Sequence, residues 1–266
     1  MCLITLNWQP GSSRPLLLAA NRDEFYARPT RSLHHWPRQR ILAGQDLQAG
    51  GTWLGSGVCA ATGRIRMAAL TNYRDVANHR VDAESRGHIA VSFLSSSITA
   101  KSYLETLAKK TSMYNPFNLI LFDGQHLLGF ESRHARLFAL PAGVTAVSNA
   151  DFNTPWPKLM SLSSAFERTL LQDTGAGVNE DSLKNRLFDL LSNSNVAPDE
   201  ALPQTGIALE RERALSATFI RTPDYGTRAC SIISIKEQTA TFTERSFDAS
   251  GFKGEVTETI GLDILQ

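Results

Sequence analysis

The segment MCLITLNWQPGSSRPLLLAANRDE, residues 1–24, decides the fold and contains the candidate nucleophile of the chain, Cys2. Residues 2–8 form an apolar, strand-like run, and residues 15–20 are apolar on both faces, as expected of a buried strand. Between them, residues 9–13 carry the Pro, Gly and Ser that are typical of turns. This pattern predicts a hairpin that brings Cys2 to the far end of the second strand.

Cys2 directly follows the initiator methionine, which is expected to be removed when so small a residue comes next. Removal would leave a thiol and a free α-amine on one residue, with ordinary pKa values near ~8.5 and ~8. Such a pair can act as nucleophile and base, which is the logic of N-terminal-nucleophile catalysis. The plainer interpretation is that Cys2 only packs within a strand, since a single cysteine is weak support for chemistry.

Composition excludes several classes of protein. The 266 residues, 42% of them hydrophobic, suit a large packed core, and no domain boundary interrupts residues 1–266. A net charge of +1 favours neither nucleic acid nor acidic lipid as a partner. We see no apolar run of roughly 20 residues that could cross a bilayer, and no signal peptide. The three widely spaced cysteines predict no disulfide framework, so we expect a reducing, cytoplasmic location.

The rest of the chain alternates between strand-like and helix-like stretches. Strand patterns follow the turn at residues 50–55 and recur at 65–71, 117–122, 126–130, 144–147, 228–235 and 239–245. Helical patterns begin at Ser85, cover residues 101–110, follow Thr154 with Pro155 in the first turn, and begin again near Asp181, while residues 28–45 and 198–206 read as loops. This order predicts an α+β domain in which sheets are packed with helical layers.

Four consecutive polar residues, Asn21-Arg22-Asp23-Glu24, follow the second strand, where the hairpin would bring Cys2. A cation beside a thiol lowers its pKa, so Arg22 would favour the thiolate. Asp23 or Glu24 could hold Arg22 in place or bond the α-ammonium group. The alternative is a charged turn at the end of a strand.

Asn72 and Asn149 each lie one or two residues past an apolar strand. Neutral amide donors at such positions suit stabilisation of an oxyanion, although loop asparagines also cap turns. Arg228 opens a late strand and could bind a substrate carboxylate or pair with Asp23. It could equally be a surface arginine at the edge of a sheet.

The histidines show no spacing typical of a metal site, so we predict no metal. His34, His35 and Trp36 belong to the basic, aromatic stretch within residues 28–45, and they are weak candidates for contacts to a flat ligand. Covalent haem attachment would need Cys-x-x-Cys-His, which the sequence lacks. We also find no Walker loop, G-x-G-x-x-G or G-x-S-x-G motif.

Motifs spread along nearly the whole chain resemble those of the NRDE family, also called the Transport and Golgi Organisation 2 family. The matching blocks are Met1-Cys2, LAANRDEFY at 18–26 with Arg28-Pro29, GGTWLG at 50–55, ALTNY at 69–73, Tyr114 with FNL at 117–119, SNA at 148–150 with Pro155-Trp156, YGTR at 225–228 and FTER at 242–245. The resemblance implies a four-layer αββα sandwich of N-terminal-nucleophile hydrolase type, with two stacked antiparallel sheets between helices.

More distantly, the pattern is similar to choloylglycine hydrolases and penicillin V acylases. Those enzymes use an N-terminal Cys, an Arg after the second strand, asparagines at the oxyanion and a late Arg. Cys2, Arg22, Asn149 and Arg228 fit these roles, and Asn72 fits less well. The distant enzymes carry an Asp a few residues beyond their Arg, whereas Asp23 and Glu24 follow at once here. Which acid takes that part stays open.

Three functions remain compatible with the sequence. The resemblance implies first a binding and trafficking protein with haem as the leading cargo, since members of the family are linked to haem trafficking and to acyl-CoA and lipid metabolism. The second is a cysteine hydrolase that acts on an acyl amide, an acyl-CoA thioester or a related lipid, and needs no cofactor. The third is a scaffold or interaction protein. Family membership does not choose among them.

Overall fold

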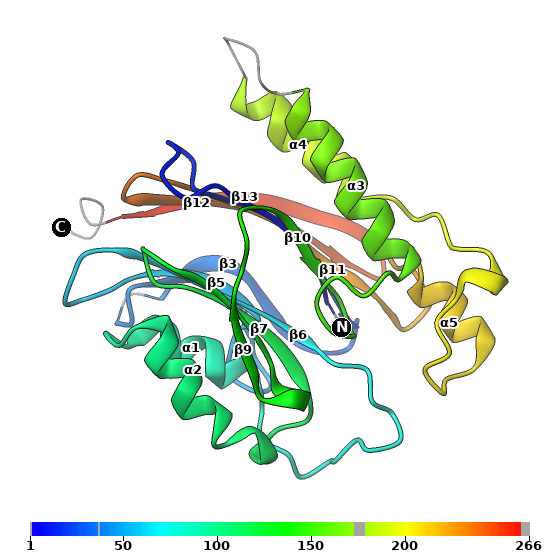
Figure 1. The fold of residues 1–266 in the computed structure, drawn as a ribbon. Helices are drawn as coiled ribbons and strands as arrows, with labels where there is room; N and C mark the ends of the chain where they lie inside the picture. The colour runs from blue at the N-terminus through cyan, green and yellow to red at the C-terminus, as the bar shows by residue number, and fades with distance from the viewer. Residues whose placement is uncertain (1, 37, 173–178, 262–266) are drawn as a thin grey trace.

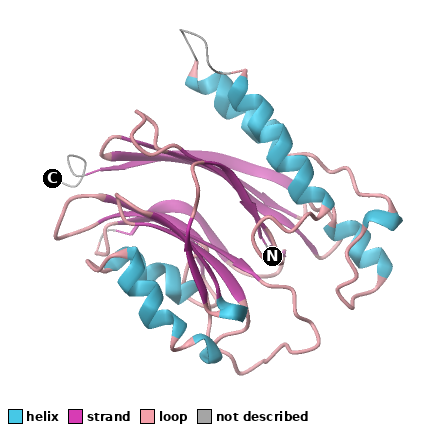
Figure 2. Ribbon diagram, viewed as in Figure 1, coloured by secondary structure: helices cyan, strands magenta, loops and turns pink. Residues whose placement is uncertain are grey.

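Two antiparallel sheets stack face to face in the computed structural model, which describes residues 2–36, 38–172 and 179–261 (Figure 1). The helices lie on the outer faces and the strands fill the middle, as Figure 2 shows. The αββα sandwich implied by the resemblance is therefore confirmed, as is the α+β class. No described helix has the length and apolar character that crossing a bilayer requires.

The first sheet has six strands in the order β10-β1-β2-β11-β12-β13, and every neighbouring pair is antiparallel. Its strands are β1 (Cys2–Trp8), β2 (Leu16–Phe25), β10 (Gly143–Val147), β11 (Tyr225–Lys236), β12 (Thr239–Asp248) and β13 (Gly251–Gly261). The predicted hairpin is confirmed, because β1 pairs with β2 in a register that puts Cys2 directly opposite Arg22.

The second sheet has seven strands in chain order, so each strand pairs with the next one along the sequence. They are β3 (Thr30–Trp36), β4 (Ile41–Asp46), β5 (Leu54–Val58), β6 (Ile65–Asn72), β7 (Phe117–Phe122), β8 (Leu127–Glu131) and β9 (Arg136–Ala139). Short connections join most of these successive antiparallel strands, but the connection from β6 to β7 is long and carries two helices.

Helices cover both sheets from outside. α1 (Gly87–Ser95) and α2 (Ala100–Ala108) pack on the seven-stranded sheet. α3 (Pro157–Leu171) and α4 (Glu180–Leu191) pack on the six-stranded sheet, and α5 (Leu209–Leu215) follows at one end (Figure 1). Three short 3-10 turns, Thr111–Met113, Ser132–His134 and Asp199–Ala201, complete the described elements.

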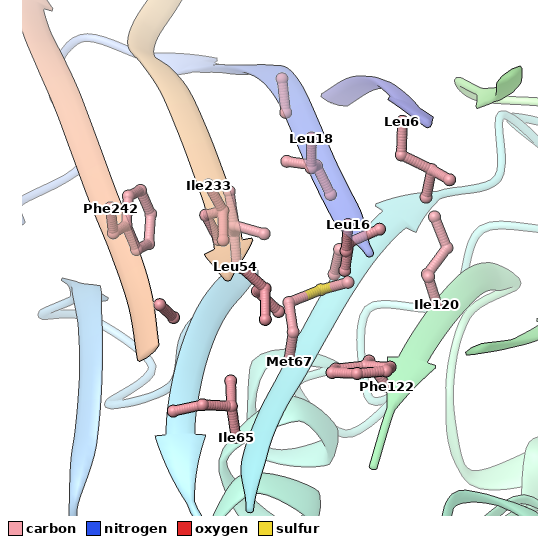
Figure 3. Packing of buried hydrophobic residues seen from close by; sticks show 14 of the residues in the cluster. Leu6, Leu16, Leu18, Leu54, Ile65, Met67, Ile120, Phe122, Ile233 and Phe242 are labelled. Carbon is pink, nitrogen blue, oxygen red and sulfur yellow. The ribbon is translucent and has the colours of Figure 1, made fainter. Parts of the chain in front are cut away.

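The alternation of side chains along β2 explains how one strand serves two apolar layers. Leu16, Leu18 and Ala20 point between the sheets, where they join the central core of Figure 3. Leu17 and Ala19 point the other way, into the layer under α3 and α4. Full burial of such an aliphatic side chain contributes about 1.5–3 kcal/mol. Because residues 16–20 of β2 are buried on both faces, this part of the strand is apolar throughout, as predicted.

Several predicted boundaries are wrong. Residues 28–45 are not a loop but contain β3 and β4. The local sequence pattern of each strand is weak, and the pairing between the two strands stabilises them. β2 runs on to Phe25, so Asn21 to Glu24 lie within the strand. α3 begins at Pro157, which makes Pro157 rather than Pro155 the proline of the first turn. β9, β13 and α5 were not predicted, since their sequences are short or mostly polar.

Candidate functional site

A cavity of about 610 Å³ opens between the two sheets where β1 begins and β2 ends. Its wall comes from both sheets and from the chain between β6 and α1. Seven cationic and six acidic residues line this wall: Arg22, Arg28, Arg31, Arg80, Arg86, Arg228 and Lys253, with Asp23, Glu24, Asp46, Glu84, Glu244 and Asp248. The volume lies within the ordinary range for small-molecule sites.

Cys2 lines this cavity as the first residue of β1. Strand alternation places its side chain on the same face as Ile4 and Leu6, between the sheets. Cys2 is 6% exposed, and burial raises the pKa of its thiol to about 11. Arg22 lowers this pKa in the expected direction, but the effect of burial is larger, so the thiol pKa stays raised in the chain with Met1. Met1, whose removal we predict, lies outside the described residues.

Arg22 reaches into the cavity from the opposing strand and is held by weak polar contacts. Its guanidinium lies 3.5 Å from Asp46 and 3.8 Å from Glu24, and it donates a 3.4 Å hydrogen bond to Thr30 Oγ1. Asp46 is bound more tightly by Arg28, at 2.7 Å. The two carboxylates thus orient Arg22 while leaving it beside the thiol.

The pleat of β2 separates the two candidate acids. Glu24 shares the inner face with Arg22, whereas Asp23 points to the opposite face. There Asp23 is 1% exposed and accepts a 2.7 Å hydrogen bond from Thr227 Oγ1. Burial raises the pKa of the Asp23 carboxyl, and nearby Lys158 opposes that rise. Glu24 therefore contacts Arg22, while Asp23 lies beneath the start of β1.

Asn72 and Asn149 come together beside Cys2. Asn149 Nδ2 donates a 2.9 Å hydrogen bond to the backbone oxygen of Asn72, and Ser148 Oγ donates to the backbone oxygen of Cys2 at 3.1 Å. Asn72 lines the cavity and Asn149 is fully buried behind it. One amide hydrogen of Asn149 is used in this contact. The oxyanion role of both residues stays a prediction.

Arg228 lines the cavity but is engaged with the backbone. Its guanidinium donates to the carbonyl oxygens of Phe247, Phe25, Tyr26 and Arg28 at 3.0–3.1 Å. It sits at the register shift between Thr227 and Ala229, where the bulge turns its side chain toward the segment after β2. These contacts give Arg228 an anchoring role for that segment.

Asn21 and the aromatic stretch lie away from the cavity wall. Asn21 Nδ2 donates 2.8 Å hydrogen bonds to the carbonyl oxygens of Leu191 and Thr218, on the helical side of the sheet. His34, His35 and Trp36 belong to β3 rather than to a loop, and Trp36 is buried with Nε1 bonded to Ala43 O. The histidine in the cavity wall is His79. The described residues contain no cluster of three metal-binding side chains.

Sequence reasoning missed two cations near Cys2. Arg86 precedes α1, donates to Pro116 O at 3.1 Å and lines the cavity. Lys158, in the first turn of α3, is 3% exposed. A signal for Lys158 exists, because it shares helical spacing with the buried Leu162 and Phe166. Arg86 has no comparable local signal.

Comparison with known proteins agrees with the motifs. The family model of Transport and Golgi organisation 2 matches residues 1–249. The chain belongs to this family. The bovine Transport and Golgi organization protein 2 homolog is 35% identical over 92% of this chain and 93% of its own length. The human homolog is 33% identical with the same coverage, and the Drosophila melanogaster protein is 28% identical over 97% of this chain and 96% of its own.

Among solved structures, a Caenorhabditis elegans N-acylethanolamine-hydrolyzing acid amidase ortholog resembles the chain loosely. The match has a TM-score of 0.49 and 9% sequence identity, and it covers 88% of this chain and 92% of the amidase. A superposition this loose says nothing about the chemistry of the Transport and Golgi organisation 2 site.

Proposed function

We propose that the cavity is the active site of an N-terminal-cysteine acyl hydrolase. The observation that carries the proposal is the position of Cys2, whose thiol lines a polar cavity of about 610 Å³ directly opposite Arg22. A buried cysteine with only a packing role would need no such cavity. Once Met1 is removed, the free α-amine of Cys2 would lie beside the thiol of the same residue at the start of β1.

The chemistry uses groups that this chain supplies. After Met1 is removed, the neutral α-amine of Cys2 takes the thiol proton, and the sulfur attacks the acyl carbon of an amide or thioester. Asn149 and Asn72 support the negative charge on the carbonyl oxygen. The ammonium then returns its proton to the leaving amine or thiol. Water, deprotonated by the α-amine, next attacks the acyl-enzyme and releases a carboxylic acid and the free thiol.

The cavity wall is nearly balanced in charge, with seven cationic and six acidic residues, so an anionic substrate would depend on the cations that no acid among the described residues pairs with. Arg28 and Lys253 are paired with Asp46 and Asp248, at 2.7 Å and 3.3 Å. The other cations of the wall that a substrate could reach are Arg31, Arg80 and Arg86. Arginine binds carboxylate and phosphate groups with paired hydrogen bonds. We therefore propose an acyl compound that carries phosphate or carboxylate groups, such as an acyl-CoA or an anionic lipid-like acyl amide.

Haem cargo is the alternative proposal. The cationic wall could bind propionates, and His79 could approach the iron. The macrocycle needs a broad apolar surface, however, whereas the large apolar side chains in the wall are Trp53, Leu70, Val81 and Phe247. The geometry thus favours acyl hydrolysis. All three cysteines are free, which fits the reducing, cytoplasmic location that remains part of the proposal.

The test compares wild type with Cys2→Ala and Cys2→Ser on a panel of acyl amides and thioesters, including acyl-CoA compounds. Cys2→Ala should lose about 10³-fold or more of the turnover, because it removes the nucleophile. Cys59→Ser, which alters another buried free cysteine outside the cavity wall, should keep wild-type turnover. Equal turnover by wild type and Cys2→Ala would reject the proposal. Saturable haemin binding without hydrolysis would favour cargo binding.

A further inference from the structure

Lys158 occupies an unusual position for a lysine. It belongs to the first turn of α3, and its side chain lies on the buried face of the helix with Leu162 and Phe166. Only 3% of the residue is exposed. Within the part of the chain that the structure describes, its Nζ makes no hydrogen bond. The usual arrangement would turn a lysine outward, with its ammonium group in water.

A contribution to folding stability does not explain why the ammonium group of Lys158 is buried. Burial removes water from the ammonium group, and the positive end of the helix dipole lies at the same turn. No acidic residue occupies the first turn of α3 to offset the charge. Burial accordingly lowers the pKa of Lys158 to about 8. A methionine of similar length would fill the same space without these penalties, so a functional reason for the amine is required.

The charged groups around Lys158 come from four neighbouring segments. The pKa of Lys158 responds to the charges of Asp23 on β2, Cys2 on β1, Arg74 after β6 and Glu212 on α5. Arg74 and Glu212 are both buried and pair with each other at 2.7 Å, so their charges largely offset. Asp23 lies on the helix-facing side of β2, beneath the point where β1 begins. On the helix-facing side of the six-stranded sheet, the charges around the Cys2 backbone that are not offset are therefore those of Lys158 and Asp23.

We propose that Lys158 is a positioning residue for the nucleophile: together with Asp23 it supplies buried charges beneath the start of β1 that hold the α-amine of processed Cys2 neutral and oriented toward its thiol. This inference rests on the proposed function. The ammonium of Lys158 makes a second positive charge on the α-amine unfavourable and favours the thiolate. Asp23 can accept a hydrogen bond from the α-amine and so fix its direction. Lys158 itself need not touch the substrate.

The experiment measures the rate of Cys2 alkylation by iodoacetamide from pH 5 to pH 10, resolved by peptide mass spectrometry, and therefore needs no known substrate. In Lys158→Met, the midpoint of the profile should rise by about one pH unit, because a nearby positive charge is lost. Lys158→Arg should restore a midpoint near that of wild type. Lys184→Met removes a partly exposed lysine of α4 and should leave the profile unchanged.

The outcomes separate this inference from the proposed function. If the mass of wild type shows that Met1 is retained, both proposals fall. If Cys2 is processed and reactive but Lys158→Met keeps the wild-type midpoint, only the role of Lys158 is overturned. Thermal unfolding confirms that each variant is folded, and Lys158→Gln provides a second neutral variant that is read in the same way. A raised midpoint that Lys158→Arg rescues is a result that a purely structural lysine would not produce.

Discussion

The two ends of the space between the sheets differ sharply although the same strands build both. At the closed end, Leu16 and Leu18 of β2 meet Met67, Phe122 and Phe242 in a continuous apolar core (Figure 3). At the open end, the inward-facing residues of β2 beyond Ala20 are Arg22 and Glu24, and the cavity lies there. The backbone continues without interruption from one end to the other. The change from aliphatic to charged side chains is what keeps the sheets from closing over Cys2.

This difference has a physical cause. Apolar side chains interdigitate at crystal-like density and leave no room for water. Charged groups must stay hydrated or paired, so the arginines and carboxylates of the open end maintain a polar cavity. The closed end should therefore govern stability, and the open end should govern reactivity. Substitutions at either end test whether these properties are separable.

The largest expected effect is on stability, from truncation of the closed end. Phe242 is 1% exposed, so Phe242→Ala should reduce the free energy of unfolding by about 3–5 kcal/mol through lost burial and a cavity. Denaturant unfolding measures this change. Phe252, which is 60% exposed on β13, provides the matched control, and Phe252→Ala should change stability by about 0.5 kcal/mol or less. Similar losses in both variants would contradict the assignment of the core.

The next effect concerns the reactivity of the open end. In a protein that keeps Met1, for instance behind a short N-terminal extension, burial holds the thiol pKa at about 11. A raised pKa keeps the thiol protonated up to a higher pH, so at pH 7 the thiolate should be about 300-fold rarer than for an ordinary thiol near 8.5. Alkylation of Cys2 should be correspondingly slow and rise tenfold per pH unit toward pH 11. Fast alkylation of the extended protein at pH 7 would show that the cavity is more open than the structure implies.

The smallest effect concerns the recognition of charge. Arg86→Met keeps most of the side-chain volume in the cavity wall but removes the guanidinium. It should raise KM for an anionic acyl substrate about 5- to 10-fold, equivalent to about 1–1.4 kcal/mol, with little change in kcat. A neutral substrate of the same acyl chain should be unaffected. Arg213→Met, on the exposed side of α5, serves as the control. Equal effects on both substrates would point to a packing role for Arg86.

Sequence patterns predicted the elements that are regular over short distances. The Pro-Gly-Ser turn and the two apolar runs were enough for the β1–β2 hairpin, and hence for the pairing of Cys2 with Arg22. They failed for β3 and β4, because Pro, Arg and His obscure the strand pattern and the pairing between the strands supplies the stability. They also placed Asn21 among the candidate site residues, although the pleat of β2 turns it toward the helices.

By itself, the sequence determined the family, the hairpin at the chain start and the identity of the candidate nucleophile, since these depend on local order along the chain. Only the tertiary structure decided which charges meet at Cys2. Glu24 and Asp23 are neighbours in sequence but lie on opposite faces of the sheet. Arg86 and Lys158 lie 84 and 156 residues beyond Cys2 in the sequence. Both come near Cys2 because α1, which follows Arg86, packs on the seven-stranded sheet and α3, which contains Lys158, packs on the six-stranded sheet. Such proximity is created by long-range packing, which no local pattern encodes.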